Sequence, residues 1–96
     1  MVDAGMNLFD IAGKTALITG GGRGLCQFMA KALAEAGVRV YLVGRREDRL
    51  SASLGDHDGA IFALDLVERG AADHLFAMVS AMDQQPDIII NAAGIN

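Results

Sequence analysis

Short apolar runs alternate with amphipathic segments along the chain. Four runs rich in aliphatic and β-branched residues are bounded by glycines, charged residues or proline, which is typical of buried strands. They lie at residues 14–20, 38–44, 60–65 and 87–94. Between them, apolar residues recur every three or four positions, which predicts helices over residues 25–36, 45–54 and 68–83. The alternation of strands and helices is the pattern of an α/β domain.

The continuous apolar character of the strands predicts a parallel sheet that is covered on both faces. Because crossovers between parallel strands are right-handed, the order 3-2-1-4 places the first two helices on one face and the last helix on the other. In such a doubly wound sheet the chain reverses direction between the first and fourth strands. Ligands bind in the crevice at the carboxyl ends of these two strands. We therefore expect the candidate site in the loops that follow them.

Composition narrows the possible partners and location. The chain has 96 residues, of which 52% are hydrophobic and 21% are charged, as expected for one small globular domain over residues 1–96. Its apolar stretches are far shorter than the ~20 residues of a membrane span. The first residues lack the order of a signal peptide, and a single cysteine excludes a disulfide framework and a cysteine-based metal site. We expect a cytoplasmic protein with no membrane partner and no metal.

The distribution of charge points to the first half of the chain. The net charge is −4, which argues against a nucleic-acid partner. Of the eight lysines and arginines, only Arg69 follows Leu50. An anionic ligand is therefore expected to be bound by residues of the first half.

Glycines are concentrated in TGGGRG, residues 19–24, between the first strand and the first helix. A turn of this kind exposes backbone N–H groups and the positive end of the helix dipole, and glycines let an anion approach closely. The segment thus predicts a phosphate site, with an ordinary glycine-rich connection as the alternative. P-loop spacing is excluded because AGKT, residues 12–15, precedes the strand and lacks the first glycine. The pattern Gly-x-Gly-x-x-Gly, started at Gly20, fails at Leu25.

The spacing that fits is Thr-Gly-x-x-x-Gly-x-Gly, with Cys26 in place of its last glycine. Here the chain resembles the short-chain dehydrogenase/reductase family. Four segments carry the resemblance in the order of the family: AGKTALITGGGRGL, LVGRR, ALDL and INAAG. It covers residues 9–96 and implies a Rossmann-like, doubly wound α/β fold that is truncated after the fourth strand. The chain would be the amino-terminal, cofactor-binding half of such an enzyme.

The resemblance implies that the glycine turn binds the pyrophosphate and adjoining ribose of a dinucleotide cofactor. The residues concerned are Gly20, Gly22, Arg23, Gly24 and Leu25. Cys26 follows them in the first helical turn, where it is a tolerated small residue, a residue that weakens cofactor binding, or a redox-active thiol.

Two further segments match the family pattern. Asp65, with Leu66, would hold the adenine end of the cofactor; the alternative for Asp65 is the N-cap of the third helix. Asn91 would brace the central strands and border the ribose, with Ala92 and Gly94 giving clearance. The alternative for Asn91 is a plain turn residue.

The end of the second strand predicts which cofactor is preferred. Relatives that prefer NAD place an aspartate there, whereas this chain has Gly44 followed by Arg45 and Arg46. A guanidinium that binds the 2′-phosphate is worth about 1.5–3 kcal/mol, enough to discriminate between the cofactors. We therefore expect NADP(H) to be preferred over NAD(H), with Arg45 and Arg23 as the selecting residues. The alternative is that RRED is a solvated helix start.

Catalytic residues are not expected within these 96 residues. The family uses a tyrosine with a lysine four positions later and a serine, but the one tyrosine, Tyr41, is followed at that distance by Arg45. The chain is therefore expected to be inactive alone, as part of an NADP-dependent oxidoreductase acting on a small alcohol or ketone. The complete enzyme would be a homo-oligomer. A truncated, non-catalytic module that binds a nucleotide or a partner is the alternative.

Overall fold

The computed structural model describes residues 11–20 and 24–91. These residues form four strands and three helices in alternation. In chain order they are β1 (Thr15–Thr19), α2 (Gly24–Glu35), β2 (Arg39–Gly44), α3 (Glu47–Leu54), β3 (Gly59–Ala63), α4 (Ala71–Ser80) and β4 (Ile88–Asn91). The α/β class expected from the hydrophobic pattern is confirmed.

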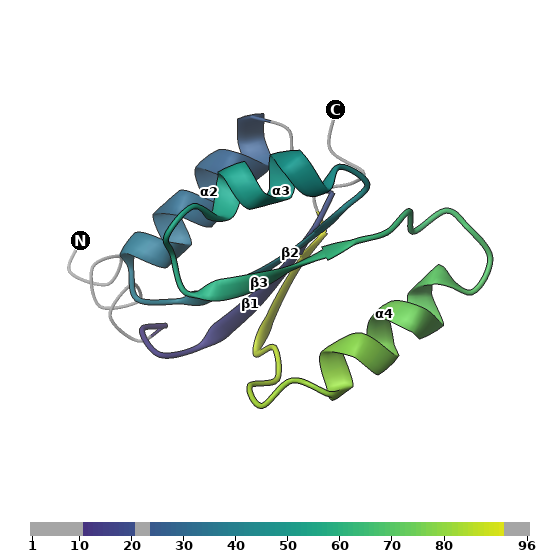
Figure 1. The fold of residues 1–96 in the computed structure, drawn as a ribbon. Helices are drawn as coiled ribbons and strands as arrows, with labels where there is room; N and C mark the ends of the chain where they lie inside the picture. The colour runs from purple at the N-terminus through teal and green to yellow at the C-terminus, as the bar shows by residue number, and fades with distance from the viewer. Residues whose placement is uncertain (1–10, 21–23, 92–96) are drawn as a thin grey trace.

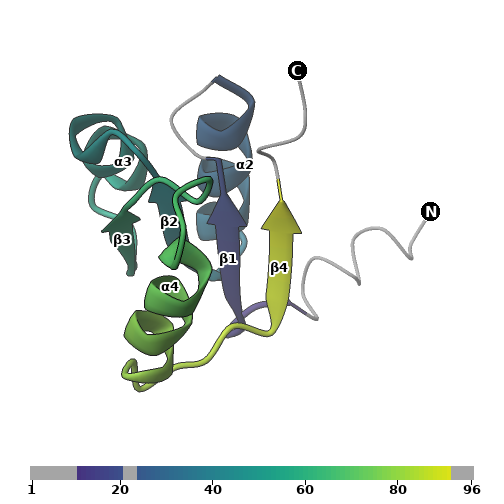
Figure 2. The same cartoon turned by 90° about the vertical axis from the view of Figure 1, so that its right-hand side faces the viewer.

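The four strands form one parallel sheet in the order β3-β2-β1-β4. Thr19 at the end of β1 lies opposite Val43 of β2 and Asn91 of β4. Figure 2 shows β4 at one edge of the sheet, with its arrowhead beside that of β1. The predicted strand order 3-2-1-4 is thus confirmed. The chain reverses direction between β1 and β4, and the candidate site was expected at the carboxyl ends of these two strands.

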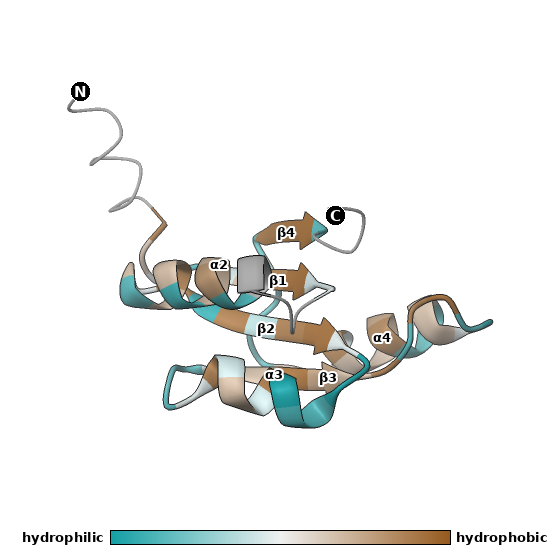
Figure 3. Cartoon of the chain, turned by 90° about the horizontal axis from the view of Figure 1, so that it is seen from above, coloured by the Kyte–Doolittle hydropathy of each residue, from teal (hydrophilic) through white to brown (hydrophobic). Residues whose placement is uncertain are grey.

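The helices lie on both faces of the sheet, as the right-handed crossover rule requires. Helices α2 and α3 cover one face, and α4 covers the other (Figure 1). Strands buried between two helical layers must be apolar on both sides, and the strands are brown along most of their length in Figure 3. The expected placement of the last helix on the opposite face is therefore confirmed.

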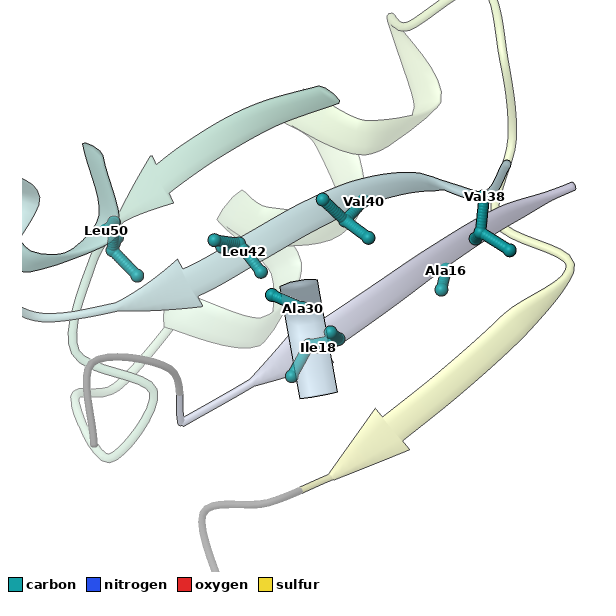
Figure 4. Packing of buried hydrophobic residues seen from close by; sticks show 7 residues of the cluster. All are labelled: Ala16, Ile18, Ala30, Val38, Val40, Leu42 and Leu50. Atoms are coloured by element: carbon teal, nitrogen blue, oxygen red, sulfur yellow. The ribbon is translucent and has the colours of Figure 1, made fainter. Parts of the chain in front are cut away.

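Each face of the sheet has its own apolar core. The core under α2 and α3 is made of small and branched aliphatic residues, which let these helices lie close to the strands. Its members, shown in Figure 4, are Ala16, Ile18, Ala30, Val38, Val40, Leu42 and Leu50. The core under α4 contains larger side chains, among them Tyr41 and Phe62. The centroids of these two rings lie 5.8 Å apart, and the rings pack edge to face.

Two elements begin later than their sequence patterns predict. The helix expected from residue 68 starts at Ala71, because the preceding Gly70 is left-handed, with φ 81°, and residues 66–70 form turns. Helix α3 starts at Glu47 instead of residue 45, since the backbone of Arg46 is extended. In both cases the residues before the helix are charged or glycine, and their backbone is not helical.

Candidate functional site

The candidate site lies at the carboxyl ends of β1 and β4, at the reversal of the sheet (Figure 2). Of the predicted site residues, Gly22, Arg23, Ala92 and Gly94 lie outside the described residues. The others border this edge: Gly20, Gly24, Leu25, Arg45, Asp65, Leu66 and Asn91. The described residues of the predicted site therefore lie at or just beyond the carboxyl ends of the four strands.

Gly20 directs the chain out of β1. Its φ of 81° lies in the left-handed region that favours glycine, and its N–H donates a hydrogen bond to the carbonyl of Val43 at 2.9 Å. Helix α2 begins at Gly24, so the backbones of Gly24 and Leu25 form its first turn. The first N–H groups of a helix have no partner inside it and favour a bound anion. This geometry is suited to a phosphate group.

Asn91 is joined to β1 through its side chain. The hydroxyl of Thr19 donates to the amide oxygen Oδ1 of Asn91 at 3.0 Å, at the position where the two residues are register partners. This bond links β1 to β4, and the place of Asn91 beside the ribose stays a prediction. Because Asn91 is the last residue of β4, the alternative that it is a plain turn residue is wrong.

The two arginines after β2 differ in their contacts. The guanidinium of Arg46 contacts both carboxylate oxygens of Asp48, at 3.3 and 3.2 Å. A hydrogen bond from Arg46 lowers the pKa of Asp48. Arg45 is exposed and makes no hydrogen bond or ion pair with any residue in the described ranges. The start of α3 is therefore exposed, and the guanidinium of Arg45 is accessible to an anionic ligand.

Asp65 lies close to the end of β2. The N–H of Leu64 donates to the carbonyl of Gly44 at 2.8 Å, which brings the segment after β3 beside that of Arg45. Carboxylate oxygen Oδ1 of Asp65 accepts the N–H of Val67 at 3.1 Å and so holds a turn. The N-cap of α4 is Gly70, so the alternative role of Asp65 as helix N-cap is wrong.

The apolar residue after Asp65 anchors this loop. Leu66 is half-buried and packs against the core under α4, the cluster that contains Leu17 and Tyr41. The loop after β3 therefore has an apolar side fixed to the core and a carboxylate at the carboxyl edge of the sheet.

Tyr41 has a structural role. It is buried on the α4 face, and its hydroxyl donates to the carbonyl of Gln84 at 2.6 Å, in the segment that precedes β4. That contact lies toward the amino end of the sheet, away from the candidate site. The expectation that Tyr41 is no catalytic acid or base stays a prediction.

A shallow pocket of about 170 Å³ lies at the opposite, amino end of the strands. It is lined by Gly13, Lys14, Ala34, Gly37, Val38, Arg39 and Asp58. Its main charged groups satisfy one another, because Arg39 and Asp58 form an ion pair at 2.8 Å. The pocket contains none of the predicted site residues.

Some residues at these strand ends were not assigned a role from the sequence. Asp87 precedes β4 and accepts the N–H of Thr15 at 3.0 Å through carboxylate oxygen Oδ2. Thr19 was part of the glycine motif, but the sequence predicted no contact for its side chain. The sequence signal is that TALIT and the segment from Asp87 to Asn91, DIIIN, both carry polar residues around three apolar ones.

Two classes of site receive no support from the described part of the chain. Within it, no group of three or more histidine, cysteine, aspartate or glutamate residues is arranged to hold a metal ion. None of its helices combines the length and apolar composition of a membrane-spanning segment.

Comparison with known proteins identifies relatives over nearly the whole chain. The family model for short chain dehydrogenase matches residues 14–96. The short-chain dehydrogenase/reductase VdtF of Byssochlamys spectabilis is 39% identical over 94% of this chain. The rhamnolipids biosynthesis 3-oxoacyl-[acyl-carrier-protein] reductase of Pseudomonas aeruginosa is 37% identical over 90% of it. The chain spans 30% and 35% of the lengths of these two relatives.

Solved structures show the same arrangement. An NADP active-site complex of RhlG from Pseudomonas aeruginosa is 31% identical and superposes on 88% of this chain and 36% of its own, with a TM-score of 0.76. A 3-oxoacyl-(acyl-carrier-protein) reductase from Agrobacterium tumefaciens C58 with NADP bound is 32% identical, with a TM-score of 0.74 over 86% of this chain and 34% of its own. The match covers the sheet and the helices on both of its faces.

Proposed function

The chain belongs to the short-chain dehydrogenase family, and on that basis we propose that it binds NADP(H) as the cofactor-binding part of an oxidoreductase. The reaction is the interconversion of a small alcohol and its ketone or aldehyde. The proposal rests on three features that lie together at the carboxyl ends of β1 and β4. The turn at Gly20, the start of α2 and the Thr19–Asn91 bond all lie there.

The pyrophosphate is assigned to the glycine turn. The left-handed backbone of Gly20 and the N-terminal N–H groups of α2 suit a dianionic group. In this proposal Gly22, Arg23, Gly24 and Leu25 complete the turn around the phosphates. Asn91 borders the adjoining ribose, and Ala92 and Gly94 leave room for it.

The adenine end is assigned to the loop after β3. The carboxylate of Asp65 accepts a hydrogen bond from the exocyclic amine, while Leu66 keeps the loop fixed to the core. Oxygen Oδ1 of Asp65 is already engaged by Val67, so Oδ2, which has no hydrogen bond to the described residues, is the acceptor for the amine.

The preference for NADP(H) over NAD(H) is assigned to Arg45, together with Arg23. Support comes from the exposed Arg45 guanidinium, which has no partner among the described residues, and from the absence of a carboxylate at Gly44. Two similar solved structures are NADP complexes. An aspartate at position 44 would repel the 2′-phosphate, whereas a guanidinium attracts it.

When bound, the nicotinamide supplies or accepts the hydride. The described residues bind and orient the cofactor, and the groups that move the substrate proton are proposed to lie outside these 96 residues. The hydroxyl of Tyr41 donates to the carbonyl of Gln84, which supports this part of the proposal. The cytoplasmic location and the homo-oligomeric assembly expected from the sequence remain predictions.

Titration of the chain with NADPH and with NADH, followed by nucleotide fluorescence, tests the proposal. We expect saturable binding, with a lower dissociation constant for NADPH. A parallel alcohol-oxidation assay should show no turnover by the chain alone. Absence of binding for both nucleotides would contradict the proposed site, and turnover would contradict the assignment of the chemistry to other residues. Binding without turnover in the complete protein as well would favour a non-catalytic module.

A further inference from the structure

The register of β4 depends on few apolar contacts. The strand has four residues and pairs with β1 alone among the described strands. Three of its residues are identical isoleucines. Ile88 and Ile90 are half-buried against the core under α2 and α3, whereas Ile89 is 70% exposed on the other face. A slip of two residues would keep each isoleucine on its own face but would place Asp87 or Asn91 opposite Leu17 in place of Ile89, so the apolar pairs favour the observed register.

Polar contacts define the register at the amino end of β4. The N–H of Asp87 donates to the carbonyl of Thr15 at 2.7 Å, and its carboxylate Oδ2 accepts the N–H of the same threonine at 3.0 Å. Both backbone polar groups of Thr15 are therefore satisfied by one residue. The carboxylate takes the place of a backbone carbonyl at a point where the chain is not yet a strand.

The carboxyl end has a second polar contact, in the same register. Four residues beyond the first pair, the hydroxyl of Thr19 donates to Oδ1 of Asn91. The segments TALIT and DIIIN thus align polar end to polar end, with three apolar pairs between them. A slip of two residues would break both contacts and would move Asn91 by about 6.6 Å along the sheet.

We propose that Asp87 is a positioning residue for Asn91, and that its double contact with Thr15 sets the register that places Asn91 at the cofactor edge. The part of this inference that concerns the cofactor rests on the proposed function. The register itself does not, because it is a property of the chain without a ligand.

NMR of the ligand-free chain tests the register. In the wild type, cross-strand proton contacts are expected between the pairs Ala16–Ile88 and Ile18–Ile90. Asp87→Ala should weaken these contacts and shift the side-chain amide resonances of Asn91. Asp87→Asn keeps an acceptor oxygen and should restore both. Asp83→Ala, which removes an exposed carboxylate without a contact in the described part, is the matched control. Unchanged cross-strand contacts in Asp87→Ala would overturn the proposal.

A second variant keeps the test decisive if Asp87→Ala does not fold. Asp87→Glu retains the charge but moves the carboxylate by one methylene, so it should shift the Asn91 amide resonances in the same direction. A folded Asp87→Glu chain with wild-type resonances for Asn91 would overturn the proposal as well.

A double-mutant cycle on NADPH affinity links the register to the site. Asp87→Ala should weaken NADPH binding about fivefold when Asn91 is present and much less in an Asn91→Ala background. A loss of equal size in both backgrounds would show that Asp87 acts only on overall stability and would overturn the positioning role. If the wild type binds no NADPH, the proposed function fails, and the NMR comparison alone decides the register.

Discussion

The guanidinium of Arg46 lies 3.2 Å from the carboxylate of Asp48, two residues along the chain, whereas the neighbouring Arg45 has no such partner among the described residues. The two neighbouring arginines therefore differ in whether their guanidinium group is already bound to a carboxylate. Two nitrogens of Arg46 already bind the carboxylate of Asp48, whose negative charge opposes a phosphate there, whereas Arg45 has no carboxylate beside it in the described ranges. The selection of NADP(H) is therefore assigned to one arginine of the pair, and this assignment can be tested.

We expect Arg45→Asp to raise the dissociation constant of NADPH about ten- to a hundredfold, because it replaces an attraction to the 2′-phosphate by a repulsion. The dissociation constant of NADH should change little. Fluorescence titrations with both nucleotides give the ratio. Arg46→Asp is the matched control and should have a smaller effect; equal effects of the two variants would contradict the assignment to Arg45.

The carboxylate of Asp48 should have a lowered pKa that depends on Arg46. Since the hydrogen bond from Arg46 lowers the pKa of Asp48 in the folded chain, the contribution of the pair to stability is present above the unfolded pKa of Asp48. It is lost as the pH falls through the lowered folded value. NMR titration of the Asp48 carboxylate should show its pKa rising in Arg46→Ala. A pKa that is unchanged by this substitution would show that Arg46 does not bind Asp48 in solution.

Gly59 should be intolerant of any side chain. A Cβ at this position would lie 1.9 Å from the carbonyl oxygen of Val40, on the neighbouring strand. Gly59→Ala must therefore separate β2 from β3, and we expect it to lower the free energy of unfolding by about 3 kcal/mol or more. Urea unfolding followed by circular dichroism measures this.

Gly70→Ala serves as the comparison for Gly59→Ala. Its φ is 81°, but no atom lies within 4 Å of the added Cβ, so only the backbone is strained. The expected loss is about 1 kcal/mol. A larger loss for Gly70→Ala than for Gly59→Ala would contradict the close approach of β2 and β3.

Tyr41→Phe should lower the free energy of unfolding without changing the binding of NADPH. The substitution leaves the carbonyl of Gln84 without the hydroxyl donor of Tyr41, at an expected cost of about 1 kcal/mol in the free energy of unfolding. The dissociation constant of NADPH should be unchanged, because the contact lies toward the amino end of the sheet. A change in that constant would place Tyr41 in the binding site or in its support.

The sequence predicted the sheet well because its patterns are local and its topology is constrained. Four apolar runs with intervening amphipathic segments indicated a parallel sheet, and for the order 3-2-1-4 the right-handed crossover rule fixed the face on which each helix lies. A bracing role for Asn91 was predicted from its place in a recognised motif. Its partner was not, because the pairing of Thr19 with Asn91 depends on a register across 72 residues.

Other features depended on backbone conformations that hydrophobic periodicity does not encode. The late start of α4 comes from the left-handed backbone of Gly70, and the spacing of apolar residues does not indicate this conformation. The difference between Arg45 and Arg46 arises from side-chain geometry at the start of α3. Asp87 was not recognised because an aspartate before a strand usually indicates only a turn.

The uneven cover of the sheet has a practical consequence for work in solution. Ile89 on β4 and Phe76 on α4 are 70% and 74% exposed, and both belong to the face that carries a single described helix. An edge strand with an apolar side chain of this exposure is a template for pairing with another chain. Sedimentation of the chain should therefore depend on its concentration, and Ile89→Lys should reduce this dependence and widen the range in which nucleotide titrations report on a monomer.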